Sequence, residues 1–178
     1  MTALVNHAAV ATCNLLLITS LCAQSGESPD YLEGRVKRIV GDSTVTVSYQ
    51  SPAVAGREIW GATLPFGSNW KVGGDRVTTI RFEENVRING NEIPGGTYGL
   101  YVHLKANDDW QLVFTRDLTA QSGAFNESDD VLRIALRPED APFRERLKLG
   151  LEEVSRRKPF GAELGLHWGR KRVSLRIR

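Results

Sequence analysis

The chain has 178 residues, of which 41% are hydrophobic and 25% are charged. This length suits one domain of about 100–200 residues, which can bury most of its apolar surface and so needs no disulfides to fold. The formal net charge of +2 is too small to imply a polyanionic partner, so we expect no nucleic-acid partner.

The first 23 residues differ in kind from the rest, because they contain no Lys, Arg, Asp or Glu. An apolar run over residues 15–18 precedes Ala23 and a polar segment with Gly and Pro. This pattern predicts a secretory signal peptide over residues 1–23, a flexible segment over 24–30 and a single β-sandwich domain over 31–178. An uncleaved anchor or a disordered tail is the alternative, because His7 alone supplies positive charge before the apolar run. That run is short for a membrane span of about 20 residues.

Both cysteines, Cys13 and Cys22, lie in this first segment. Cleavage after Ala23 leaves a mature chain without cysteine, which excludes disulfides, thiolate catalysis and Cys-based zinc sites. Lipidation of Cys22 normally needs a small residue before it, and Leu21 stands there. We therefore expect an exported protein, periplasmic or extracellular, that is not a lipoprotein.

From Tyr31 onward, apolar residues alternate with polar ones, as in strands with one core face and one wet face. The runs lie at 44–49, 78–82, 98–105, 110–115, 132–137, 147–152, 164–168 and 173–178. Turn-forming pairs separate them, among them Asn89-Gly90, which is typical of a two-residue hairpin, and Gly169-Arg170. The pattern predicts an all-β antiparallel sandwich, jelly-roll or Ig-like, of about ten strands, with a short helix or turn near 62–67.

Short motifs follow one another in a specific order along most of the chain. They are GREIWG at 56–61, LPFG at 64–67, NWKVGGD at 69–75, TT at 78–79, VRING at 86–90, IPGGTY at 93–98, Trp110, and a strand over 130–133. This set resembles the bacterial domain-of-unknown-function family numbered 2911, whose members look like secreted or envelope-associated β-proteins without an established activity. Lys71, Gly74 and Asp75 stand where the family usually has Arg, Ala and Asn. Lys71 keeps the charge but loses the bidentate geometry of Arg.

The best candidate for a binding site is the polar cluster carried by these motifs. Its residues lie on predicted loops or strand ends, where ligands are usually met on a rigid sandwich. The structural alternative is that Arg57 and Lys71 form ion pairs with acidic neighbours and so hold a long loop in place. In that case Trp70 packs into the end of the sandwich. The candidate ligand-binding residues are Arg57, Glu58, Trp70, Lys71, Asp75, Thr79 and His103.

These residues favour a non-catalytic exported module that binds a small molecule, a glycan or an envelope protein. One alternative is a hydrolase in which Lys71, Asp75 and His103 converge, and another is a purely structural envelope subunit. The sequence contains no G-x-S-x-G elbow and no dinucleotide fingerprint. Neither His103 nor His167 has a His, Cys or carboxylate at ligand spacing, so we expect no cofactor and no metal.

The C-terminal part of the chain is basic, at 156–158, 170–172, Arg176 and Arg178. Such a stretch is able to meet anionic envelope polymers or phosphates. We interpret it instead as turns and solvent-facing strand positions, where Lys and Arg guard a sheet edge against aggregation.

Overall fold

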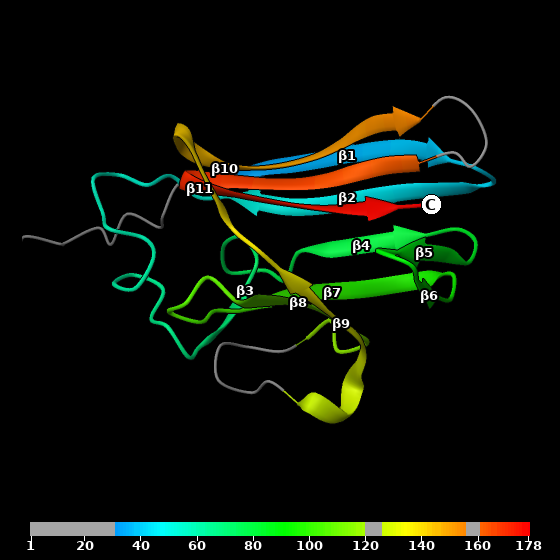
Figure 1. Cartoon of the computed structure of the whole chain (residues 1–178), viewed down its shortest axis with the longest axis horizontal. Coiled ribbons are helices and arrows are strands. Elements are labelled where there is room, and N and C mark those ends of the chain that lie inside the picture. Colours follow the sequence, from blue (N-terminus) through cyan, green and yellow to red (C-terminus); the bar gives the residue numbers. More distant parts are fainter. Residues whose placement is uncertain (1–30, 120–125, 156–160) are drawn as a thin grey trace, which may run out of the picture.

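A computed structural model describes residues 31–119, 126–155 and 161–178 (Figure 1). The expected signal peptide, the segment over 24–30, the Cys22 position and the basic run at 156–158 lie outside the described residues. Within the described part, no helix has the length and apolar character needed to cross a membrane.

The described residues form two antiparallel sheets, as expected for a sandwich. The larger sheet has the order β1 (Leu32–Val40), β2 (Ser43–Ser51), β4 (Thr79–Phe82), β7 (Gly96–His103), β8 (Trp110–Thr115) and β9 (Asp130–Leu136), with β3 (Asn69–Lys71) also pairing with β7. The smaller sheet has the order β10 (Glu139–Ser155), β11 (Gly161–Ile177), β5 (Val86–Ile88) and β6 (Asn91–Ile93). A short 3-10 helix, η1 (Glu127–Asp129), precedes β9, and turns occupy residues 61–67. The prediction of an all-β antiparallel sandwich is confirmed.

The alternating pattern of the sequence places the core between the sheets. In β2, Val45 and Val47 are fully buried, and they lie opposite Phe82 and Ile80 of β4. Successive residues of a strand point to opposite faces, so the intervening threonines stay partly exposed. Each fully buried aliphatic side chain of this kind contributes roughly 1.5–3 kcal/mol.

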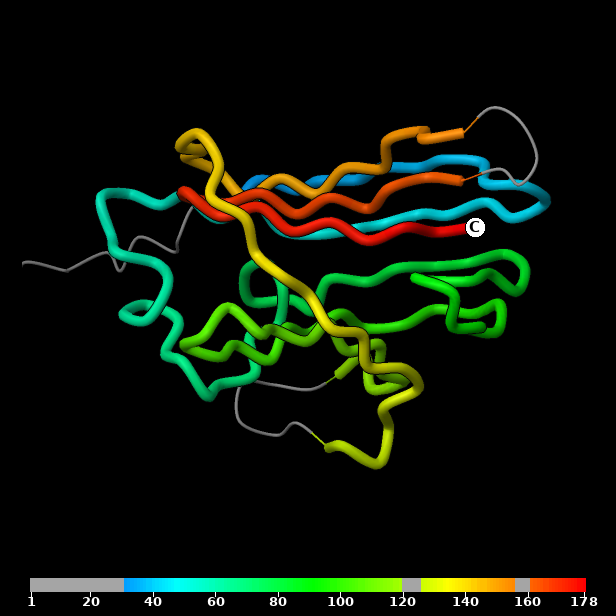
Figure 2. Tube along the Cα trace, in the orientation of Figure 1, coloured from blue at the N-terminus to red at the C-terminus, as the bar shows by residue number. Residues whose placement is uncertain are grey.

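Two of the expected turns are formed as the sequence predicts. Asn89 and Gly90 have φ angles of 47° and 92°, and they join β5 to β6 by a two-residue hairpin that requires positive φ at both positions. Gly169 has φ of 58°, and β11 reverses direction there, so that its two arms run side by side (Figure 2). Gly161, at the start of the first arm, accordingly lies beside the carbonyl of Ile177 at the end of the second.

One edge of the smaller sheet is closed by side chains of the larger one. β1 and β2 lie beside β10 (Figure 1). The carbonyl oxygens of Leu147, Leu149 and Leu151 on β10 accept hydrogen bonds from Ser51 Oγ (2.6 Å), Tyr49 Oη (3.3 Å) and Arg38 Nε (3.3 Å). These bonds occupy carbonyls that would otherwise offer an edge to another chain, so the sandwich is partly closed like a barrel.

Candidate functional site

All four tryptophans of the chain gather at one end of the sandwich. Trp70 stacks on Trp168 with ring centroids 5.7 Å apart, and Trp60 meets Trp70 edge-on at 5.5 Å and Trp110 at 4.8 Å. Trp110 Nε1 donates a hydrogen bond of 3.0 Å to the carbonyl of Lys105. Aromatic pairs at these separations add to the energy of burial, so the cluster closes this end of the core.

A cavity of about 620 Å³ opens beside this cluster. Its volume lies within the range of about 300–1,000 Å³ usual for small-molecule sites. Four of the residues proposed from the sequence line it, namely Arg57, Trp70, Lys71 and Asp75. The other lining residues are Tyr31, Pro52, Thr63, Leu64, Ser68, Asn69, Gly73, Gly74, Tyr101 and Trp168.

The cavity runs along the free edge of β3. Residues 68, 70 and 72 direct their main-chain groups to β7: Leu104 N donates to Ser68 O at 3.0 Å, Trp70 pairs with Val102, and Val72 N donates to Leu100 O at 3.2 Å. Antiparallel pairing alternates, so the main-chain groups of Asn69 and Lys71 face the opposite edge. The side chain of Trp70 enters the core, whereas Asn69 and Lys71 project from the other face of the sheet.

Two glycines allow the loop after β3 to form one wall of the cavity. A Cβ on Gly73, whose φ is 110°, would lie 2.9 Å from the main-chain oxygen of Gln50. A Cβ on Gly74 would lie 2.7 Å from Gln50 Oε1 and 2.9 Å from the ring of Tyr31. An alanine at position 74 would therefore require the side chains of Gln50 and Tyr31 to shift, and glycine lets the loop pack directly on both.

Main-chain oxygens hold both cations of the cavity. Lys71 Nζ donates to the carbonyl of Asp75, while Arg57 donates from Nε to Val54 O (3.1 Å) and from Nη2 to Ala53 O (2.7 Å). The carboxylate of Asp75 interacts with the hydroxyl of Tyr31. Burial raises the pKa of Tyr31 above its ordinary value, and the charge of Asp75 and the hydrogen bond to it raise the pKa further, against an opposing effect of Arg57.

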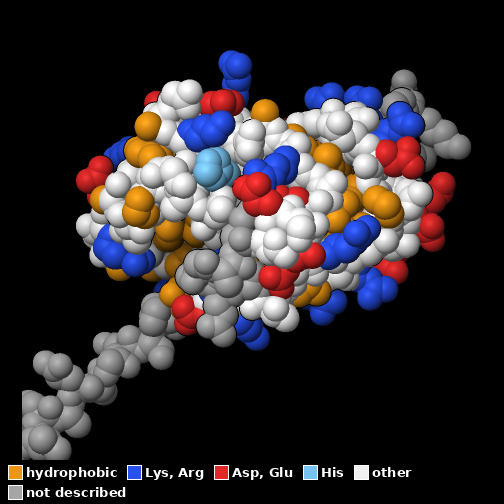
Figure 3. Space-filling model, turned by 90° about the horizontal axis from the view of Figure 1, so that it is seen from below, with side chains coloured by type: hydrophobic (Ala, Val, Ile, Leu, Met, Phe, Trp, Pro, Cys, Tyr) orange, Lys and Arg blue, Asp and Glu red, His pale blue; other side chains and the backbone are white. Residues whose placement is uncertain are grey.

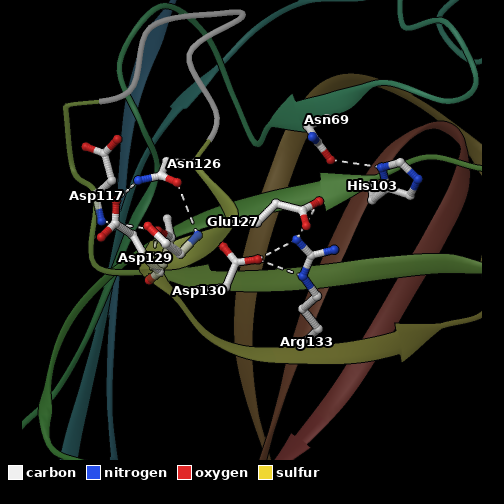
Figure 4. A network of polar contacts seen from close by, with 10 residues as sticks. Asn69, His103, Asp117, Asn126, Glu127, Asp129, Asp130 and Arg133 are labelled. Atoms are coloured by element: carbon white, nitrogen blue, oxygen red, sulfur yellow. Dashed lines mark hydrogen bonds and ion pairs between the residues drawn. The ribbon is translucent and has the colours of Figure 1, made fainter.

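The other three proposed residues do not line the cavity. Glu58 is exposed, and its carbonyl accepts hydrogen bonds from Thr63 N (3.0 Å) and Thr63 Oγ1 (2.7 Å). Thr79 lies within β4, opposite Gly99. His103 Nδ1 lies 2.9 Å from Oδ1 of the lining residue Asn69 on the outer face of the sheet (Figure 4). His103 is therefore one residue removed from the cavity wall.

A second cluster of charged side chains, on the outer face of the larger sheet, was not predicted from the sequence. Arg133 Nε donates to Asp130 Oδ2 at 2.6 Å, and Arg133 Nη2 lies 3.1 Å from Glu127 Oε1, which ties η1 to β9 (Figure 4). Burial raises the pKa of the Asp130 carboxyl, although Arg133 opposes the shift. The contacts join neighbouring elements, so the group has a structural role.

Several residues of the cavity lay outside the sequence-based proposal. Tyr31, Tyr101 and Trp168 come from distant parts of the chain, and only folding brings them beside Lys71. Among residues 31–119, 126–155 and 161–178, no group of three or more His, Cys, Asp or Glu is placed to hold a metal ion. The side chains that line the cavity are mainly aromatic, charged or hydroxyl-bearing.

The fold and the cavity define a small antiparallel β-sandwich with a polar, loop-built pocket at one end. Over residues 33–177 the chain matches the model of the family described as protein of unknown function DUF2911, so it belongs to this family, and the resemblance seen in its motifs is confirmed. No curated protein and no solved structure matches the chain.

Proposed function

We propose that the protein is a binding module that holds a small polar ligand in the cavity beside β3. The observation that carries this proposal is the meeting of Arg57, Lys71 and Asp75 with aromatic side chains around about 620 Å³ of space. Ligand sites combine apolar walls with a few placed polar groups in this way. The first 23 residues have the composition of a signal peptide, so the proposal includes binding outside the cytoplasm.

The charges of the cavity favour a ligand with an anionic group. Two cationic side chains face one carboxylate. The Nε and Nη2 groups of Arg57 already donate hydrogen bonds to carbonyls of its own loop. A guanidinium carries five N–H donors in all, so others stay available. The remaining donors suit a carboxylate or phosphate of the ligand. The partly exposed ring of Tyr31 supplies aromatic surface for the rest of a small, flat molecule, and the largely buried Trp70 and Tyr101 contribute only their exposed edges.

Binding fits the lining better than hydrolysis. The serine and threonine hydroxyls of the lining donate to main-chain oxygens, Ser68 Oγ to Pro65 O at 2.6 Å and Thr63 Oγ1 to Glu58 O at 2.7 Å. A nucleophile needs a base within hydrogen-bond reach, and His103 bonds Asn69 instead. We therefore propose a binding role rather than a hydrolase centred on Lys71 and Asp75.

Thermal unfolding with a panel of sugar phosphates, amino sugars, nucleotides and amino acids tests the proposal. A ligand at a hundred times its dissociation constant adds about 2.7 kcal/mol, a shift of several degrees. Thr63→Tyr should place a bulky ring in the wall of the cavity, obstruct ligand entry and abolish the shift. Thr97→Tyr, at an exposed position of β7, should retain it. A shift that survives Thr63→Tyr, or no shift with any compound, would contradict a small-molecule site here.

Asp75→Asn separates a binding site from a structural clamp. Lys71 bonds the main-chain oxygen of Asp75, so this variant leaves that bond in place while it removes the negative charge. We expect unchanged stability without ligand, within about 0.5 kcal/mol, and tighter binding of anionic ligands. A large loss of stability, with ligand affinity unaltered, would show that the carboxylate serves as a clamp.

A further inference from the structure

A second feature lies on the outer face of the smaller sheet, apart from the cavity. Two adjoining depressions of about 550 Å³ and about 200 Å³ cross this face, and both include Glu163 in their walls. Their charged lining residues come from β10, both arms of β11, the residue that follows β11, and β5. The cations are Arg87, Arg144, Lys148, Arg172, Arg176 and Arg178, and the carboxylates are Glu152 and Glu163. We call these eight residues and the surface between them the basic face.

The basic face carries more positive charge than the net charge of the whole chain suggests. Six cations and two carboxylates give it a charge of +4, whereas the whole chain carries +2. The rest of the molecule is therefore net negative by two charges. On the side of the larger sheet, Lys and Arg are interspersed with Asp and Glu (Figure 3). A net charge near zero thus conceals a local field of one sign.

Strand pairing brings these side chains to one surface. Lys148 lies opposite His167 and Glu152 opposite Glu163 in the register of β10 with β11. Arg87 and Arg178 exchange both main-chain hydrogen bonds (2.7 and 2.9 Å), so their side chains project from the same face. The reversal of β11 at Gly169 is what places its C-terminal arginines beside β5.

The floor of the basic face is low and open. Gly150 and Gly165 lie opposite each other, and a Cβ on either would meet nothing within 4 Å. The two glycines leave a strip without side chains between the charged rows. A linear molecule can lie along such a strip without displacing any side chain.

Several of the cations lack an acidic partner on this surface. Glu163 lies 3.6 Å from Arg172, and Arg87 lies 3.6 Å from Glu92. Arg144 Nε donates to His167 Nδ1 at 3.1 Å. Within the described part of the chain, Lys148, Arg176 and Arg178 make no ion pair with a carboxylate side chain.

We propose that the basic face binds an acidic polysaccharide. An exposed ion pair contributes little to binding, so this open surface holds a single small anion only weakly. A polymer with an anionic group on each sugar engages several cations at once. The lining residues include no Phe, Tyr or Trp, the side chains on which nucleic-acid bases stack, so a sugar polymer fits better than single-stranded DNA.

The test compares binding of dextran sulfate and of uncharged dextran of equal length at low salt, by biolayer interferometry. We expect binding to dextran sulfate alone, weakened by salt because exposed charges are screened. Lys148→Glu with Arg176→Glu should lower the affinity at least about tenfold. Arg116→Glu with Arg137→Glu, which changes the net charge equally from exposed positions after β8 and β9, should lower it less than about threefold.

Three results would overturn the proposal: equal binding of the two dextrans, equal losses in the two double variants, or tighter binding of a 20-nucleotide single strand than of dextran sulfate. Circular dichroism checks the fold of each variant, and Lys148→Gln with Arg176→Gln replaces the charge reversals if these fail to fold. Thr63→Tyr should bind dextran sulfate as the wild type does, so that failure of the cavity proposal and of this one are distinguishable.

Discussion

The two ends of the sandwich are built differently (Figure 1). At one end, the two-residue turns Gly41-Asp42 and Asn89-Gly90 join neighbouring strands. At the other end, the chain leaves the sheets for residues 52–68 and 72–78, and the tryptophan cluster and the cavity lie there. We call these the hairpin end and the loop end.

The difference shows where the chain obtains its hydrogen bonds. At the hairpin end, the turns are two residues long and the residues that flank each turn pair with each other, as Val40 does with Ser43 and Ile88 with Asn91. At the loop end, distant partners are needed, as where Val54 N donates to Glu145 O at 2.7 Å and Arg76 N donates to Gln50 Oε1 at 3.0 Å. Loops held by remote contacts of this kind place side chains at positions that a regular sheet does not offer, which suits them to binding.

Removing the central ring of the loop end should give the largest effect. Trp70→Ala should lower the free energy of unfolding by about 3–5 kcal/mol, because Trp70 is buried and packs on Trp168 and Trp60. Urea unfolding measures the change. Trp70→Phe keeps a ring and should lose less than half as much. A loss below about 1 kcal/mol in the alanine variant would mean that the cluster does not close this end.

A matched pair of glycines compares the two ends directly. Gly90 at the hairpin end has φ of 92° with open space around it, so Gly90→Ala should cost about 1 kcal/mol from backbone strain alone. Gly73 at the loop end has φ of 110° and the main-chain oxygen of Gln50 2.9 Å from an added Cβ. Gly73→Ala should cost about 2–3 kcal/mol, because β2 must also shift. Equal losses in urea unfolding would contradict the close approach.

An ion pair at the loop end should give the smallest effect. Lys171 Nζ lies 3.1 Å from Asp108 Oδ2 and 3.2 Å from Asp140 Oδ1. Lys171→Met should cost about 0.5 kcal/mol at pH 7, because the carboxylates are largely exposed and such pairs are weak. The measurement is again urea unfolding, with Lys37→Met on the exposed face of β1 as the control.

The loss of stability caused by Lys171→Met should change with pH in one direction. Burial favours the neutral amine of Lys171, but its hydrogen bonds to Asp108 and Asp140 and their charges raise its pKa above 10.5. The folded state therefore binds the proton more tightly than the unfolded state. The contribution is complete below pH 10.5 and is lost as the pH rises through the raised value, so the gap between wild type and variant should narrow there. A gap that widens with pH would contradict this account.

Most of the fold could be predicted from alternation and turn chemistry. Val45, Val47, Ile80 and Phe82 form the buried face of paired strands as their spacing predicts. In two strands the alternation of apolar and polar residues is too weak to predict the strand. β3 has a single buried residue among three, and β1 is an edge strand with charged residues at Arg35 and Lys37 and few buried positions. Edge strands of this kind avoid a regular apolar face because it would invite pairing with other chains.

The candidate site could be predicted only in part. The motif order drew attention to Arg57, Trp70, Lys71 and Asp75, which all reach the cavity. Tyr101 and Trp168 read as ordinary strand residues, and nothing in the local sequence places them beside residue 71. The basic face is likewise invisible in the net charge, because it depends on which side of each strand faces outward.

The side-chain bonds that close the edge of β10 have a consequence for folding kinetics. Each joins positions far apart in the chain, with separations of 96, 100 and 113 residues. Contacts of such long range lose a large loop-closure entropy when they form, and topologies rich in them fold slowly. The seam between β1, β2 and β10 should therefore close late, and Ser51→Ala should accelerate unfolding while leaving the refolding rate nearly unchanged.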